Sequence, residues 1–266
     1  MAVHMGYMGS ATIGAEVFLT GSSFAPIQQV FAPDVVQQTN FKRVWCWGKV
    51  ESGGNVSGYI SVGMDNLWSE AFSRTDDDPG PQKTVDIEFV QGGGYGMTAY
   101  LNSVEASASA GEAAQFSADL FSGEMTVKRK GDGGTRSKAA PRADCMALVL
   151  WSECSANCGV GGDYQAFTAS VNNNLERIYA LNQGSTLPFT ILGGWKEVSG
   201  SASIYADGAP DAGTSGDTSG SGSQSATMSF SFGPMTGGCT VAVQHGVGSA
   251  TTGPGIYNYN FTGVGC

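Results

Sequence analysis

Gly96-Met-Thr-Ala-Tyr-Leu-Asn-Ser-Val-Glu-Ala-Ser-Ala-Ser-Ala-Gly111 aligns without a gap with Gly238-Cys-Thr-Val-Ala-Val-Gln-His-Gly-Val-Gly-Ser-Ala-Thr-Thr-Gly253, which begins 142 residues later. The identical positions are Gly96/Gly238, Thr98/Thr240, Ser107/Ser249, Ala108/Ala250 and Gly111/Gly253. The same offset pairs Val56-Ser57-Gly58 with Val198-Ser199-Gly200. A repeat of this length corresponds to a whole domain and not to a solenoid unit. We therefore expect two similar domains in tandem, with residues 56–62 superposing on residues 198–204.

The composition fits two β-rich domains. The chain has 266 residues, of which 40 are glycine, 41% are hydrophobic and 14% are charged. It is too apolar to be disordered, and glycine-rich, charge-poor sequences are typical of short strands joined by turns. We expect a first domain at residues 1–127, a basic linker at 128–143 and a second domain at 144–266. The linker is either a solvated hinge or a contact for an acidic partner.

Alternation of apolar and polar residues predicts half-buried antiparallel strands in both parts of the chain. Residues 84–90 and 227–232 alternate most clearly, so their polar side chains should face away from the core. Those polar residues are Asp86, Glu88, Ser229 and Ser231. Further strands are expected at residues 56–62, 97–104, 115–121 and 256–261, with a loop or an edge at residues 107–111.

One helix and one long loop are expected between the strands. Residues 65–73 should form a short helix, capped by Asp65 and carrying Trp68 and Phe72 on one apolar face. Residues 207–225 consist almost entirely of Gly, Ser, Thr, Asp, Ala and Pro, which predicts a long mobile loop. This loop occupies the place in the second repeat that the helix occupies in the first.

The sequence contains no constellation typical of an enzyme or a metal site. Neither histidine lies in the sequence context of a catalytic triad, and the glycine-rich residues 92–96 are not a phosphate-binding loop. Cys145, Cys154 and Cys158 offer three thiolates where structural zinc requires four ligands, so buried thiols are favoured over zinc. We expect no enzymatic activity, no metal and no cofactor.

The net charge and the expected lack of targeting segments narrow the class of protein further. The net charge of −10 opposes binding to nucleic acid, which requires positive charge to displace counterions from phosphates. The N-terminal residues form neither a signal peptide nor a membrane anchor, and the longest apolar run, residues 145–151, is too short to cross a bilayer. We expect a protein made in a cytoplasm, without a membrane partner.

Two elements of the second half form a recognisable pair. The first element is a strand followed by an Asn-Asn-x-Leu-Glu-like turn, and the second is a Glu-Val-Ser-Gly strand. Their residues are Asn173, Asn174, Leu175 and Glu176, then Glu197, Val198, Ser199 and Gly200. With these two elements the chain resembles the tail-tube proteins of long-tailed bacteriophages. The resemblance covers about 40 residues of the second half; the first half matches through Val56-Ser57-Gly58 and residues 107–111 and lacks the asparagine element.

The resemblance implies a β-sandwich-like or half-barrel domain with a flanking helix. In that family six domains close a ring around an inner β-barrel, and rings stack into a tube that conducts DNA. A duplicated chain would close the ring as a trimer, with itself, the tape-measure protein and other tail proteins as partners, in a virion assembled in the host cytoplasm. Asp86, Glu88, Ser229 and Ser231 become candidates for the lumen. Candidates for contact between rings are Asp207, Gly208, Asp211, Asp217 and Ser225.

Other classes of protein remain open. A distal-tail ring or a tube terminator of the same fold would differ from a repeating tube protein because it occurs once per particle. A two-domain β-sandwich adhesin using residues 207–225 for binding would remain monomeric in solution. The outward direction of the polar strand residues is also open, since alternation defines a face of the sheet but not whether that face lines a lumen.

Overall fold

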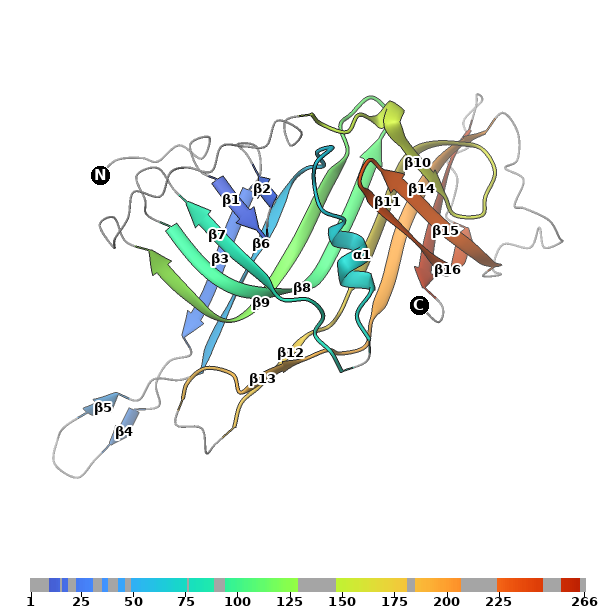
Figure 1. Ribbon diagram of the computed structural model, residues 1–266. Coiled ribbons are helices and arrows are strands. Elements are labelled where there is room, and N and C mark those ends of the chain that lie inside the picture. Colours follow the sequence, from blue (N-terminus) through green and yellow to red (C-terminus); the bar gives the residue numbers. More distant parts are fainter. Residues whose placement is uncertain are drawn as a thin grey trace.

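The structure is a computed structural model that describes residues 10–14, 16–18, 23–30, 35–37, 43–45, 49–75, 77–88, 94–128, 147–180, 185–206, 224–245 and 255–263. The expectation of a mainly β protein is confirmed. In the described residues, thirteen strands form one curled sheet (Figure 1). Two small two-stranded sheets are separate from this hydrogen-bonded sheet: β4 (Val35–Gln37) with β5 (Arg43–Trp45), and β12 (Glu176–Ile178) with β13 (Thr190–Leu192).

The first half of the chain builds one side of this sheet. Its antiparallel order is β3-β6-β9-β8-β7-β1, with β2 added at the end. The strands are β1 (Ser10–Ile13), β2 (Glu16–Phe18), β3 (Ser23–Val30), β6 (Val50–Tyr59), β7 (Lys83–Glu88), β8 (Gly94–Ser109) and β9 (Gln115–Lys128). In the described part of the chain, β3 pairs only with β6, so its other edge is open.

The second half repeats this arrangement strand for strand. Its order is β11-β14-β17-β16-β15-β10, so each strand takes the place of its counterpart in the first half. The strands are β10 (Cys154–Asn157), β11 (Asp163–Asn172), β14 (Glu197–Ala206), β15 (Gln224–Phe232), β16 (Met235–His245) and β17 (Gly255–Gly263). The matching order agrees with the internal repeat, and the superposition of residues 56–62 on 198–204 stays a prediction.

The two halves are joined edge to edge by β8 and β11. The first part of β8 pairs with β7, and its last part, Ser103–Ser109, pairs with β11. The expectation that residues 107–111 form a loop or an edge is therefore wrong for Ser107, which is paired on both sides, whereas Ala108 and Ser109 pair with β11 only. The expected division between domains falls between two halves of one sheet. Apart from Lys128, the expected linker lies outside the described residues.

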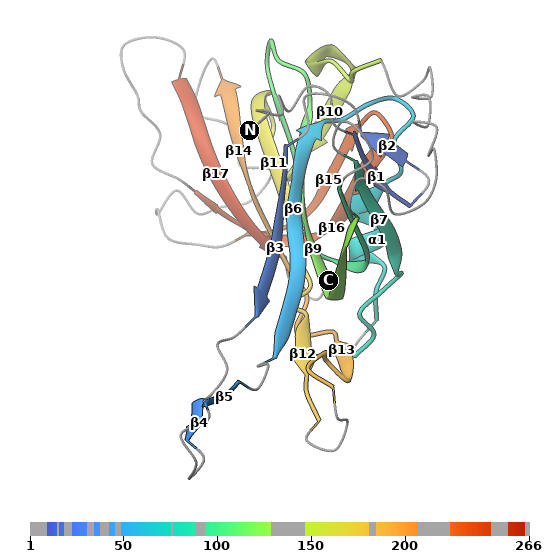
Figure 2. The same ribbon diagram turned by 90° about the vertical axis from the view of Figure 1, so that its left-hand side faces the viewer.

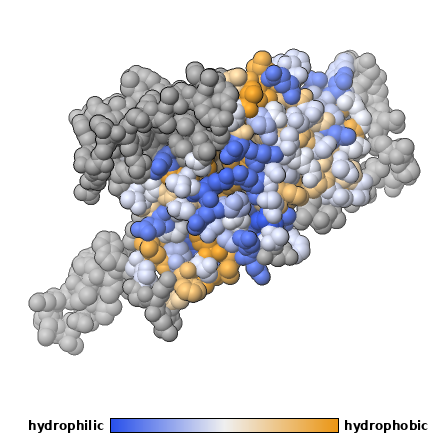
Figure 3. All heavy atoms as spheres, viewed as in Figure 1, coloured by the Kyte–Doolittle hydropathy of each residue, from blue (hydrophilic) through white to orange (hydrophobic). Residues whose placement is uncertain are grey.

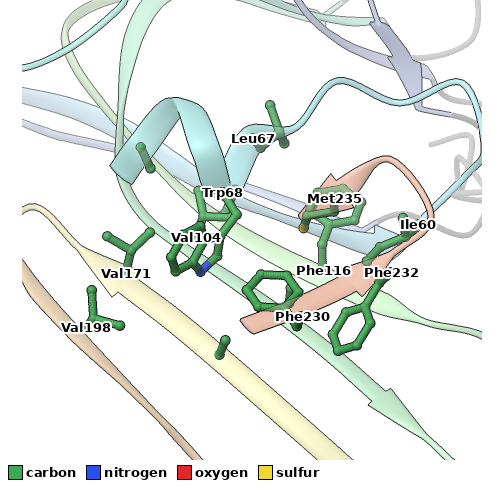
Figure 4. Close-up of a cluster of buried hydrophobic side chains, with 14 of the residues drawn as sticks. Ile60, Leu67, Trp68, Val104, Phe116, Val171, Val198, Phe230, Phe232 and Met235 are labelled. Atoms are coloured by element: carbon green, nitrogen blue, oxygen red, sulfur yellow. The ribbon is translucent and has the colours of Figure 1, made fainter. Parts of the chain in front are cut away.

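Helix α1 (Leu67–Phe72) covers the junction and connects the cores of both halves. Trp68 stacks on Phe72 at 4.9 Å between ring centroids and meets Phe230 of β15 edge-on at 5.2 Å (Figure 4). Gly237 of β16 lies against the Trp68 ring, where a Cβ atom would come within 2.4 Å of a ring carbon. Val104, Val171 and Val198 continue the same cluster across the junction. One hydrophobic core thus serves both halves.

Three local expectations need correction. The helix cap is Asn66 and not Asp65, because the Asn66 side chain accepts a hydrogen bond from the backbone N–H of Ser69. Ser225, expected in the long loop, is the second residue of β15 and pairs with Ala242. Among the described residues of the second half, the helical elements are limited to the 3-10 turn η3 (Trp151–Glu153). The flanking α-helix expected in each half is therefore seen, in the described residues, only in the first half.

Candidate assembly surface

A continuous polar face covers the side of the central strands that points away from the core. One row of directly paired residues crosses six strands, β6-β9-β8-β11-β14-β17, and therefore both halves. The row is Ser57, Ser117, Glu105, Ser170, Ser199 and Thr262. Their chain neighbours Val56, Ala118, Val104, Val171 and Val198 are buried, which fixes the direction of the row. In Figure 2, α1 and β7 lie to the right of β6 and β17, two of the strands that carry this row.

The flanking rows are also mainly polar. The row on one side consists of Tyr59, Gln115, Ser107, Thr168, Ser201 and Asn260, and the row on the other consists of Asn55, Asp119, Ser103, Asn172 and Glu197. Apart from Lys128, the last residue of β9, these six strands contain no lysine or arginine. Except for Tyr59, these three rows consist of uncharged polar and acidic side chains, an arrangement that repels phosphate and does not bind it.

Asp119 is the least solvated acid on this face. Burial raises the pKa of its carboxyl above the ordinary value, while a hydrogen bond from Asn102 and the charge of Arg177 act in the opposite direction. Asn102 Nδ2 donates to Asp119 Oδ2 at 2.8 Å. Asn102 Oδ1 accepts from the backbone N–H of Leu175. The acid is thus tied to the turn that follows β11.

The four residues predicted from alternation lie beside this face and not in its central rows. Asp86 of β7 is half-buried, next to the fully buried Val85, and lines a hollow that is bounded on its other side by residues 187–191. The side chain of Glu88 lies outside the described residues. Ser229 is exposed and Ser231 half-buried on β15, between buried Met228, Phe230 and Phe232. Their predicted direction away from the core is confirmed for the three described side chains.

Asn173 of the family motif forms the centre of the junction between the halves. Its side chain is buried and donates to the carbonyl oxygens of Ala71 at 3.1 Å and Leu101 at 2.9 Å. Its Oδ1 accepts from Nε of the buried Arg74 at 2.7 Å, and its backbone carbonyl accepts from Arg74 Nη2 at 3.0 Å. Arg74 also donates to the carbonyl of Gly194. This amide thereby connects α1, β8 and the second half through direct hydrogen bonds.

The remaining motif residues have structural positions that the sequence could not assign. Asn174 has a left-handed backbone with φ of 46° and donates to the carbonyl of Trp195 at 2.7 Å, while Leu175 is buried and Glu176 exposed. In β14, Val198 is buried and Glu197 and Ser199 are exposed. Gly200 lies under the ring of Phe261, where a Cβ atom would come within 2.3 Å of a ring carbon.

A second contact between the halves is made by the hairpin β12 (Glu176–Ile178) and β13 (Thr190–Leu192). The guanidinium of Arg177 lies 3.6 Å from the centroid of the Phe121 ring and donates to the carbonyls of Ser122, at 3.0 Å, and Ser52. Tyr179 donates to the carbonyl of Val50 at 2.8 Å. Sequence reasoning missed this contact, since one Arg in a short polar strand carries no signal of its own.

Exposed apolar side chains gather at opposite ends of the strands. At the end where β6 stops, Tyr59, Val62, Leu148, Leu150 and Trp151 are exposed. Beside β13, at the other end, Phe189, Leu192 and Trp195 are exposed, the last at 82%. Figure 3 shows hydrophobic residues at both ends and polar residues between them. Contiguous exposed apolar residues mark surfaces that contact other proteins.

Comparison with protein-family models found no matching family, and comparison with curated protein sequences found no match. Within the described residues, no helix is long and apolar enough to span a membrane. Cys154 and Cys158 are free thiols, and burial raises the pKa of both. Among the residues that the structure describes, no three His, Cys, Asp or Glu side chains gather as metal ligands. Asp207, Gly208, Asp211 and Asp217 lie outside the described residues.

Proposed function

We propose that the chain is the repeating subunit of a tail tube, a structural and non-catalytic virion protein of a long-tailed bacteriophage. The observation that carries the proposal is the β8–β11 junction. It joins two sheets of the same strand order edge to edge, while β3, the counterpart of β11, has one unpaired edge among the residues that the structure describes. Open edges are templates for pairing with another chain, and natural proteins cover them.

The repeat indicates which strand would cover this edge. Within the chain, β11 pairs with β8 beyond the point where β7 stops. In the next copy the equivalent place is the end of β16, beyond Val243, where pairing with β15 stops. Pro26 in β3 lacks an N–H and weakens such pairing by one hydrogen bond at most. If each copy contributes two halves, three copies close a ring of 3 × 2 = 6 halves.

The polar face would then line the channel of the ring. Its serine, threonine and asparagine side chains offer no cation to phosphate, and its charged residues are acidic. Three copies carry 3 × −10 = −30 charges, so DNA passes a surface that repels it. The partners are further copies of the chain, the tape-measure protein and the neighbouring tail proteins, and DNA is present only in passage.

Native mass spectrometry of the purified protein tests the proposal. We expect trimers and multiples of trimers, and negative-stain images of rings or tubes. A protein that stays monomeric at high concentration would contradict the proposal and favour an adhesin. Trimers that never stack would instead indicate a distal-tail or terminator ring, which purified particles would contain once and not in many copies.

A further inference from the structure

A hollow of about 750 Å³ lies at one end of the polar face, between β7, β8 and β9 on one side and residues 187–191 on the other. Figure 1 shows β12 and β13, which flank these residues, below β8 and β9. Pro188 closes the hollow over β9, because a Cβ atom at Gly123 would lie 3.1 Å from the Cγ of Pro188. The volume is in the range of clefts that bind a ligand or a segment of chain.

The register of the three strands forms the floor of this hollow. Asp86 of β7 pairs with Gly96 of β8, which pairs with Thr126 of β9. Gly96 contributes no side chain to the space between Asp86 and Thr126, whose backbones are two strand spacings, or about 10 Å, apart. Next to this row the register of β8 and β9 shifts, and Glu124 lines the hollow as well.

The chemistry of the hollow favours a positively charged occupant. Its two acids are Asp86, which is half-buried, and Glu124, which is exposed. Among the described residues that line the hollow, none is lysine or arginine. Phe189, 63% exposed at the rim, offers an aromatic ring on which a cationic side chain can pack. The remaining polar lining includes Gln82, Thr84, Thr98 and Tyr100.

The chain itself supplies a basic segment at the rim of this hollow. Strand β9 ends at Lys128, two residues after Thr126. Residues 128–142 carry six of the 13 basic residues of the chain and a single acid, Asp132. The positive charge of the chain is therefore concentrated where the acidic hollow begins.

The length of this segment is sufficient for it to follow the hollow. The described chain resumes at Ala147, whose carbonyl accepts from the N–H of Val62, beyond the end of β6. That end of β6 lies beside the start of β9, so the chain must run back over the length of β9. The 14 residues of β9 span about 46 Å, whereas 19 residues can reach about 65 Å. The return path can therefore pass through the hollow, which lies along the last third of β9.

We propose that residues 129–142 dock in this hollow of their own chain, with Lys and Arg side chains on the carboxylates of Asp86 and Glu124. The contact itself does not require a ring. Its consequence rests on the proposed function: docking pairs the basic segment with acids at the end of a face that has to repel phosphate. An unpaired basic segment at this place would instead attract passing DNA.

Zero-length crosslinking with a carbodiimide tests the contact directly, because it joins only carboxylates and amines that touch. We expect Lys130 or Lys138 to be linked to Asp86 or Glu124. In an equal mixture of light and heavy isotope-labelled protein, these links should join peptides of the same label. The Lys83–Glu70 ion pair, at 2.7 Å, is the positive control. Light–heavy links, links of both lysines to other carboxylates alone, or no links while the control pair reacts would overturn the inference.

Trypsin cleavage after the basic residues of 129–142 provides the second test. The rate is divided by that of a synthetic peptide of the same sequence. Asp86→Asn combined with Glu124→Gln should raise this ratio about two- to tenfold, the range of two exposed ion pairs. High salt should raise it in the unmodified protein, which requires no variant to fold.

Glu105→Gln, an exposed acid of the same polar face away from the hollow, is the matched control and should leave the ratio unchanged. Equal ratios in the double variant, the control and the unmodified protein at both salt concentrations would overturn the docking. Ring formation by native mass spectrometry is measured separately on the same variants, so failure of the docking and failure of the proposed function are distinguishable.

Discussion

The two halves of this chain have the same strand order but differ in what their first strand and their small hairpin contact. In the second half, β11 is paired on both sides and the β12–β13 hairpin lies on a neighbouring surface. In the first half, one edge of β3 is unpaired among the described residues, and the β4–β5 hairpin stands clear of the sheet. The elements are alike in the two halves. We therefore propose that a second copy supplies to the first half what the first half supplies to the second.

The buried amide of Asn173 has no counterpart in the first half at the offset of the repeat. The residue 142 positions earlier is Phe31, so the first half has no equivalent amide. Asn173→Leu should lower the free energy of unfolding by about 3 kcal/mol, because Arg74 loses a buried acceptor and two carbonyls lose their donor. Urea unfolding measures the change, with the exposed Asn260→Ala as a control. Equal effects of the two variants would show that the junction does not depend on this amide.

Two glycines test whether the sheets are built alike in the two halves. Gly53 pairs with Phe121 and Gly200 pairs with Phe261, and an added Cβ would come within 2.3 Å of the Leu120 carbonyl oxygen or 2.1 Å of the Thr168 carbonyl oxygen. Gly53→Ala and Gly200→Ala should each destabilise by about 1–3 kcal/mol in thermal or urea unfolding. Ser199→Ala, on the exposed side of β14, is the control. A large loss in one half only would mean that the halves tolerate crowding differently.

A charge reversal compares the polar face with the surface outside it. Glu105→Lys would place three lysines per ring in the channel if each ring holds three copies, and counterion release would then make passing DNA adhere. Ejection should slow at low salt and recover at high salt. Glu112→Lys, at the exposed turn after β8, is the control. Slowing by the control alone, or by neither variant while tubes form, would place the channel on another face of the molecule.

The smallest effect concerns Asp119. Burial raises the pKa of this carboxyl, so the folded protein holds the proton more tightly than the unfolded chain does. Its contribution to stability is fully present below the unfolded pKa and decreases as the pH rises through the folded one. Asp119→Asn should therefore stabilise the protein at neutral pH, with the difference disappearing in acid. A stability difference between Asp119→Asn and the unmodified protein that is the same at neutral and at acidic pH would contradict this explanation.

The sequence predicted the strands that alternate bulky apolar and polar residues, such as residues 84–88 and 227–232. It did not reveal the polar face, because in Ser103-Val-Glu-Ala-Ser-Ala-Ser109 the inward residues are mostly alanine and contrast little with serine. The pairing of β8 with β11 and the contacts of Asn173 and Arg177 join residues that are far apart in sequence. Local periodicity carries no information about such contacts.

Electron cryomicroscopy of the assembled protein tests the central claim most directly, because strands can be traced across the contact between copies. We expect three copies in each ring, with β3 of one copy antiparallel to the end of β16 in the next and six similar sheets around the channel. Rings in which β3 remains unpaired, or in which copies meet through surfaces unrelated to the β8–β11 junction, would contradict the account.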